Sequence, residues 1–120
     1  EKLHIYRGDL RNREFVYEVF KKNYVGGNSF DGVIHFAGLK SVSESIKYPL
    51  KYWDFNVKGT INLIEVMSKF NCFTIVFSSS ASVYDSSLNC FFSEDNQIKP
   101  MSPYAKTKES VERILFDFYI

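Results

Sequence analysis

Short runs of β-branched and aromatic residues alternate with amphipathic, helix-like stretches along this chain. The strand-like runs cover residues 3–6, 32–36 and 73–77, and between them apolar residues recur with helical spacing. Strands that are separated by a helix pair in parallel, because the crossover returns the chain to the same end of the sheet. The pattern therefore predicts an α/β protein built on a layered parallel sheet.

Two of the intervening stretches carry signals for the start of a helix. Asn12 is a suitable N-cap for a first helix, and Pro49 is favoured at the first position of a second helix that runs to about Phe70. Residues 26–28 predict a turn between elements. The inward faces of the two helices are predicted to carry Phe15, Val16, Val19 and Phe20 in the first, and Trp53, Val57, Ile61, Ile64 and Met67 in the second.

Composition is typical of a globular protein and excludes several classes. At 120 residues the chain suffices for at most one domain, so residues 1–120 are expected to be part of a single domain. The hydrophobic fraction of 45% argues against disorder, and a net charge of +1 argues against a nucleic acid partner. No apolar run is long enough to cross a bilayer, so we expect no membrane partner.

The cysteines and histidines suggest no metal chemistry. Cys72 and Cys90 lack the spacing of a zinc or redox motif, and no signal peptide opens the chain. We therefore expect no metal site and a reducing, cytoplasmic setting. His4 and His35 lie among apolar neighbours and are interpreted as core histidines without a chemical role.

The last helical stretch places a tyrosine and a lysine on its inward face. Residues with the period of one helix face are Tyr104, Lys108, Val111, Leu115 and Phe118. Burying a lysine is costly unless a polar group or a cleft receives it. Taken alone, the helix favours a lysine that extends past the core and a tyrosine that merely packs. A functional Tyr–Lys pair is the alternative.

Small or polar residues follow each strand-like run, at 8–10, 36–40 and 78–80. In open parallel sheets, ligands bind where strands end and loops begin. Ala37 and Gly38 would let a flat ligand approach the backbone closely, and serine hydroxyls can both donate and accept hydrogen bonds. Each group alone is common, but combined with the Tyr–Lys pair they predict a ligand site.

These motifs resemble the extended short-chain dehydrogenase/reductases, and within them the UDP-glucose 4-epimerases. The Tyr-x-x-x-Lys pair is shared by the whole superfamily, whereas the stretch HFAGLKSVSES and the triple serine favour epimerases over related dehydratases. The resemblance covers nearly the whole chain and implies a partial NAD-binding, Rossmann-like, doubly wound parallel sheet. The residues that carry it are Asp9-Leu10, residues 35–45, Asn56, residues 77–84 and residues 102–108.

The resemblance implies an NAD-dependent epimerase that interconverts UDP-glucose and UDP-galactose by transient oxidation at C4. Tyr104 would be the general acid/base for the sugar 4-hydroxyl. Lys108 would assist it and hydrogen-bond the nicotinamide ribose, and Ser80 would bind the 4-oxygen, so that Ser80 and Tyr104 contact the substrate. The complete enzyme is expected to be a homodimer that binds a UDP-sugar.

The resemblance also implies further contacts with NAD. Asp9 would accept a hydrogen bond from the adenine amine, with Leu10 packing near the ring, and Asn56 would hold the lysine end of the site. The other residues expected to line the cofactor are Phe36, Ala37, Gly38, Lys40 and Ser78, besides Tyr104 and Lys108. Without the resemblance, Asp9 could simply close a turn, Asn56 could face solvent, and Lys40 could be a surface charge.

Two parts of the family pattern are missing. The chain has no G-x-G-x-x-G turn for a pyrophosphate, and it begins at what resembles the family's third strand and ends after the Tyr–Lys helix. We therefore expect a fragment without the first two strands and the substrate domain. Residues 3–6 would lack a partner, since strands three and four are not neighbours in the doubly wound order, while 32–36 and 73–77 could still pair. Marginal stability and no turnover are expected of the chain alone.

Alternatives to an epimerase remain open. Another extended family member acting on nucleotide sugars, such as a dehydratase or a decarboxylase, would share most of these motifs. An inactive, truncated remnant would keep the fold. One local departure is Asp85, which stands where the family usually has Gly and leaves the shape of the loop after the serines in question.

Overall fold

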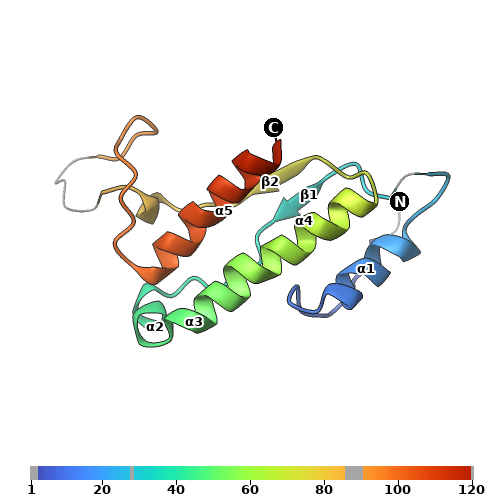
Figure 1. Cartoon of the computed structure of the whole chain (residues 1–120), viewed down its shortest axis with the longest axis horizontal. Helices are drawn as coiled ribbons and strands as arrows, with labels where there is room; N and C mark the ends of the chain where they lie inside the picture. The colour runs from blue at the N-terminus through green and yellow to red at the C-terminus, as the bar shows by residue number, and fades with distance from the viewer. Residues whose placement is uncertain (1–2, 28, 86–90, 120) are drawn as a thin grey trace. The chain divides into compact units, whose positions relative to one another are not determined.

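The computed structural model describes residues 3–27, 29–85 and 91–119, so Asn28, Asn89 and Cys90 lie outside the described residues. Among these residues no helix has both the length and the apolar character needed to span a bilayer. The elements in chain order are α1 (Arg13–Lys22), β1 (Val33–His35), α2 (Val42–Lys47), α3 (Pro49–Tyr52), the π-helix η1 (Trp53–Lys58), α4 (Gly59–Lys69), β2 (Ile75–Phe77), the 3-10 helix η2 (Ala81–Val83) and α5 (Pro103–Tyr119) (Figure 1).

The chain forms two compact units, which are described separately. The first unit comprises Glu1–His35 and Lys58–Phe77, and the second comprises Phe36–Val57 and Ser78–Ile120. The first unit contains the sheet, α1 and α4. The second contains α2, α3, η2 and α5, and with them most of the residues that the sequence singles out for chemistry.

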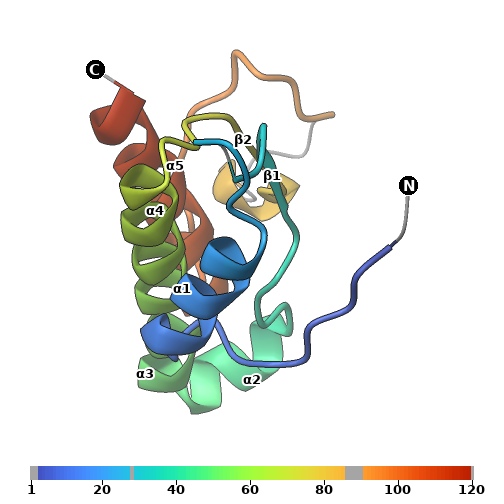
Figure 2. The same ribbon diagram turned by 90° about the vertical axis from the view of Figure 1, so that its right-hand side faces the viewer.

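Strands β1 and β2 pair in parallel, as the sequence predicts. Val33 lies opposite Ile75 and His35 opposite Phe77, and Figure 2 shows the two strands side by side. Only one face of the pair is covered within the described residues, because Ile34 is 66% exposed while His35 is 3% exposed. The interpretation of residues 32–36 as a buried strand therefore holds for one face only.

The strand predicted at residues 3–6 is wrong. The backbone there has no regular structure, Leu3 and Ile5 are almost fully exposed, and the segment runs clear of β1 and β2 (Figure 2). A strand forms only where a neighbour satisfies its N–H and C=O groups, and no described strand pairs with this segment. The expected lack of a partner is thus confirmed. His4 is exposed and is not a core histidine.

Helices α1 and α4 pack against each other and form the core of the first unit (Figures 1 and 2). The Asn12 side chain accepts a hydrogen bond from the Phe15 N–H at 3.1 Å, which confirms the predicted N-cap. His35 is confirmed as a core histidine, because its Nε2 lies 2.8 Å from Thr60 Oγ1. The buried core residues are Val16, Phe20, Leu63, Val66, Met67, Phe70 and Cys72.

The helix predicted from Pro49 to about Phe70 is confirmed as the continuous run of α3, η1 and α4, but its predicted inward face is partly wrong. Trp53 and Ile61 are each 38% exposed, whereas Tyr52, Asn56 and Thr60 are buried. Tyr52, Asn56 and Thr60 recur every four residues, so they lie on one helix face, next to the predicted face. Of the five predicted inward residues only Ile64 and Met67 are buried.

The N-cap of α1 gives a direct test of local stability. Replacing Asn12 by Ala removes the acceptor for the Phe15 N–H and should lower the free energy of unfolding by about 1 kcal/mol. Asn12→Asp keeps an acceptor at the same position and should retain most of that stability. Urea unfolding followed by circular dichroism measures both, and equal losses in the two variants would contradict the capping role.

Candidate functional site

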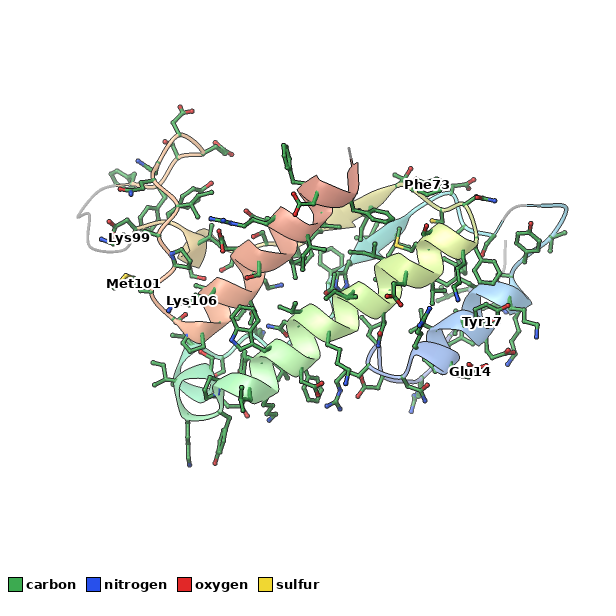
Figure 3. All side chains as sticks on the ribbon, in the orientation of Figure 1. Glu14, Tyr17, Phe73, Lys99, Met101 and Lys106 are labelled. Atoms are coloured by element: carbon green, nitrogen blue, oxygen red, sulfur yellow. The ribbon has the colours of Figure 1, made fainter. Side chains whose placement is uncertain are left out.

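Helix α5 buries Tyr104 and Lys108 on its inner face. Tyr104 is 8% and Lys108 is 7% exposed, next to the fully buried Val111, whereas Phe118 at the end of the helix is exposed. Lys106 lies between the two in the sequence and is exposed; it stands near the start of α5 in Figure 3. The predicted stripe is confirmed over its first three members, and it distinguishes Lys108 from an ordinary surface lysine.

Lys108 meets a backbone carbonyl instead of extending past the core. Its Nζ donates a hydrogen bond to the Ser78 carbonyl oxygen at 2.8 Å. Burial lowers the pKa of Lys108 below its usual value, since desolvation disfavours the charged form. The carbonyl is the polar receiver that a buried lysine requires, so the interpretation of Lys108 as an extended surface residue is wrong.

The serine run is fixed to α5 at consecutive residues. The Ser78 carbonyl accepts from Lys108, and the Ser79 hydroxyl donates to the carboxylate of Glu112, one turn further along α5. Ser80 Oγ lies 2.9 Å from Ser82 Oγ and caps η2, and η2 packs against α5. Ser80 therefore directly follows Ser78 and Ser79, which are both bonded to α5, the helix that carries Tyr104.

Asn56 connects the loop after β1 to α5. It is 4% exposed. Its Oδ1 accepts from the Leu39 N–H at 2.7 Å, and its Nδ2 donates to the Leu39 carbonyl and to Thr107 Oγ1, both at 3.0 Å. Thr107 Oγ1 donates in turn to the Tyr104 carbonyl at 2.7 Å. The solvent-facing interpretation of Asn56 is therefore wrong, and its amide spans the loop and the backbone of the tyrosine.

Gly38 is small for a reason that the sequence did not indicate. A Cβ at this position would lie 3.0 Å from Asn56 Oδ1 and 4.0 Å from Lys108 Nζ, so the close approach that needs Gly is to Asn56. Phe36, Ala37 and Lys40 of the same loop are exposed, as Gly38 is. The loop thus offers open surface beside the buried lysine.

Asp9 and Leu10 belong to the first unit. The Asp9 carboxylate accepts from the Arg11 N–H at 2.8 Å and pairs with the guanidinium at 2.7 Å. Hydrogen bonding to Arg11 holds the pKa of Asp9 below its usual value. The Asp9 carbonyl also accepts from the Asn12 N–H, so this aspartate closes a turn, and Leu10 packs beside Gly59.

Sequence reasoning missed several residues around Tyr104. Tyr52 is fully buried; its hydroxyl donates to Glu44 at 2.8 Å and accepts from the Ser41 N–H at 3.0 Å. Helix α2, which begins after Ser41, was not predicted. Thr107 could have been found, because it falls three residues after Tyr104 and so on a neighbouring strip of the helix. Tyr52 could have been found as well, because it precedes Asn56 by four residues and so lies on the same helix face.

The loop that contains Asp85 is held by an ion pair. Asp85 is buried, and its Oδ2 lies 3.0 Å from Lys99 Nζ. Tyr84 and Ile98 form an antiparallel bridge beside it. The residue that departs from the family pattern thus has a structural partner. Across the described residues, no cluster of three or more His, Cys, Asp or Glu side chains could hold a metal ion.

Comparison with known proteins places the chain in a family of nucleotide-sugar enzymes. A family model described as GDP-mannose 4,6 dehydratase matches residues 1–119, and the chain belongs to this family. The chain is similar to UDP-glucose 4-epimerase 2 of Oryza sativa subsp. japonica, with 47% identity over 117 residues, 98% of this chain and 28% of that relative. A bifunctional UDP-glucose 4-epimerase and UDP-xylose 4-epimerase 1 of Pisum sativum is 48% identical over 110 residues, 92% of this chain and 30% of the relative.

A solved structure agrees with this similarity. The crystal structure of UDP-glucose 4-epimerase from Bifidobacterium longum, in complex with NAD+ and UDP, superposes with a TM-score of 0.85 at 39% identity. The match covers 95% of this chain and 33% of that protein, so the chain spans a third or less of the length of these relatives. The Rossmann-like fold and the resemblance to UDP-glucose 4-epimerases are confirmed.

The Asn56 amide predicts a large stability effect. Asn56→Leu removes three hydrogen bonds and leaves the Leu39 N–H and the Thr107 hydroxyl without this partner. We expect a loss of roughly 2–4 kcal/mol in the free energy of unfolding, since each buried polar group that loses its partner costs about 1–3 kcal/mol. Asn96→Ala, in an exposed turn, should cost much less. Equal losses in urea unfolding would contradict the network.

Glu44 predicts a pH dependence with a defined sign. Hydrogen bonds from Lys51 and then from Tyr52 lower the pKa of Glu44. A carboxyl whose pKa is lower in the folded state contributes stability above its unfolded pKa of about 4.3, and this contribution is lost as the pH falls through the folded value. The stability difference between the wild type and Glu44→Gln should therefore shrink from about pH 6 to about pH 3. Glu94→Gln, at an exposed position, is the control, and an unchanged difference for Glu44→Gln would contradict the prediction.

Proposed function

We propose that this chain is the central segment of an NAD-dependent UDP-glucose 4-epimerase, which interconverts UDP-glucose and UDP-galactose. The observation that carries the proposal is the buried ammonium of Lys108, one helical turn from Tyr104 and bonded to the residue two before Ser80. Relatives named as UDP-glucose 4-epimerases at 47% and 48% identity support the reaction. The Bifidobacterium longum epimerase, crystallised with NAD+ and UDP, supports the cofactor and the nucleotide of the substrate.

In this proposal Tyr104 is the acid/base. Its phenolate oxygen takes the proton of the sugar 4-hydroxyl and later returns it. Lys108 stabilises the negative charge of this phenolate before the proton is taken and after it is returned, because the ammonium is desolvated and therefore poorly screened. The Ser80 hydroxyl binds the 4-oxygen, since a hydroxyl can accept and donate in turn as the proton moves.

NAD, when bound, supplies a reversible acceptor for the hydride of sugar C4. Among the residues that would hold it, Phe36, Ala37, Gly38 and Lys40 have exposed surface. Lys108 would hydrogen-bond the nicotinamide ribose. Return of hydride to the opposite face of C4, and of the proton to the 4-oxygen, would invert this carbon with no net oxidation. The residues assigned to NAD are Asp9, Leu10, Phe36, Ala37, Gly38, Lys40, Asn56 and Ser78, with Tyr104 and Lys108.

The same proposal places the complete enzyme in the cytoplasm, as a homodimer acting in galactose metabolism. A second copy of the enzyme is the partner that the family resemblance implies.

A dehydratase that acts on a nucleotide sugar is the second candidate. It is favoured by one observation, which is that the matching family model carries the description GDP-mannose 4,6 dehydratase. Both reactions would begin with oxidation at C4 and would use the same tyrosine and lysine. They differ in the product, because a dehydratase releases water and leaves a keto sugar, whereas an epimerase returns a sugar isomeric with the substrate.

Tyr104→Phe, made in the complete protein that contains this chain, tests the acid/base. Removing the hydroxyl should lower kcat by about 10²–10⁴-fold, because the group proposed to take the proton is lost. NAD binding and the unfolding midpoint should stay close to the wild-type values, since the ring is kept. The measurements are conversion of UDP-glucose to UDP-galactose, NAD titration and thermal unfolding.

Tyr84→Phe is the matched control, because it removes a phenol hydroxyl at a residue outside the proposed site. Its turnover should equal that of the wild type. Full activity in Tyr104→Phe would disprove the role of Tyr104. If the wild-type protein releases a keto sugar, the dehydratase proposal holds and the epimerase proposal is disproved.

A further inference from the structure

Tyr52 joins two parts of the second unit that the proposed reaction uses. It is the last residue of α3 and is 0% exposed. Its hydroxyl accepts a hydrogen bond from the N–H of Ser41, the residue that follows the exposed loop 36–40. Its ring lies against the ring of Tyr104. One side chain thus contacts both the residue that follows the loop assigned to NAD and the residue assigned to proton transfer.

The hydroxyl of Tyr52 fixes the end of the loop. It accepts from the Ser41 N–H at 3.0 Å and donates to Glu44 at 2.8 Å. Ser41 follows Lys40 directly and is the N-cap of α2, where its Oγ accepts from the Glu44 N–H at 3.2 Å. Lys51 holds the other oxygen of the Glu44 carboxylate at 2.8 Å. Ser41 and Glu44, the two partners of the Tyr52 hydroxyl, are therefore themselves held by other hydrogen bonds.

The ring of Tyr52 supports the ring of Tyr104. Their centroids are 6.4 Å apart and the planes meet at 84°, an edge-to-face arrangement that aromatic pairs prefer. The backbone of Tyr104 is held by Thr107, which leaves the ring to be oriented by side-chain packing. Because Tyr52 is fully buried and its hydroxyl is engaged at two atoms, it cannot turn away without breaking both hydrogen bonds.

We propose that Tyr52 is a positioning residue of the enzyme, whose ring orients the Tyr104 phenol and whose hydroxyl fixes the cofactor loop through Ser41. The inference rests on the proposed function for its link to catalysis. The role of the ring and the role of the hydroxyl can be tested separately, because different substitutions remove them. Tyr52→Phe deletes the hydroxyl and keeps the ring, whereas Tyr52→Leu deletes the ring as well.

The experiment compares the two variants in the complete protein. For Tyr52→Phe we expect the dissociation constant of NAD to rise by about 2–10-fold, the effect of losing a net hydrogen bond, with kcat near the wild-type value. For Tyr52→Leu we expect kcat to fall as well, by about 10–100-fold, because small displacements of a catalytic group are costly. Retention of kcat by the Phe variant is a result that a general loss of stability would not produce.

Tyr48→Phe and Tyr48→Leu are the matched controls. Tyr48 is 48% exposed and lies just before α3, so neither substitution should alter kcat or NAD affinity. Unchanged NAD affinity in Tyr52→Phe, or an equal fall of kcat in Tyr52→Phe and a folded Tyr52→Leu, would overturn the proposal. If Tyr52→Leu does not fold, the result for Tyr52→Phe alone decides.

Failure of the proposed function would look different. A wild-type protein that binds NAD without epimerising UDP-glucose would disprove the epimerase and leave the NAD affinity of Tyr52→Phe as the measure of loop anchoring. A wild-type epimerase whose Tyr52→Phe variant binds NAD normally would disprove only the positioning role.

Discussion

The hydrogen bond from the buried Lys108 ammonium to the Ser78 carbonyl is the contact on which the site depends. A desolvated ammonium is costly unless a polar group receives it, and here the receiver is the backbone at the start of the serine run. The same bond therefore places Ser78 against α5, and the bond from Ser79 to Glu112 repeats the attachment one turn later. These two bonds join the chain just before Ser80 to α5, the helix that carries Tyr104. They therefore fix the direction in which the chain enters Ser80.

Asn56 provides the complementary constraint from the other side of the second unit. It lies in the π-helix η1, and π-helical turns are frequent at functional sites. An asparagine offers an acceptor and a donor together, and Asn56 uses both on Leu39 while it also reaches Thr107. In the part of the chain that the structure describes, no buried side-chain nitrogen or oxygen lacks a hydrogen-bond partner. The cluster is therefore suited to rigid placement, since unsatisfied buried groups would favour rearrangement.

Much of this arrangement could be predicted from the sequence because it depends on period and local chemistry. The spacing of Tyr104 and Lys108 predicted that they share one helix face, and the residue type of Asn12 predicted the N-cap of α1. What could not be predicted depends on tertiary context. The run at 3–6 has the composition of a strand but no described neighbour to pair with. The contacts of the Tyr52 hydroxyl with Ser41 and Glu44 depend on how α2 and α3 pack, and no local pattern predicts them. The roles assigned to the site residues stay predictions.

The way Tyr104 is held suits a reaction in which the same proton moves in both directions. Its backbone carbonyl is fixed by Thr107 and its ring by Tyr52, whereas its hydroxyl receives no hydrogen bond from the residues that the structure describes. These contacts hold the ring and the backbone and leave the oxygen able to donate and to accept. The packing of α3 against α5 is therefore the part of the fold that would support the acid/base role proposed for Tyr104.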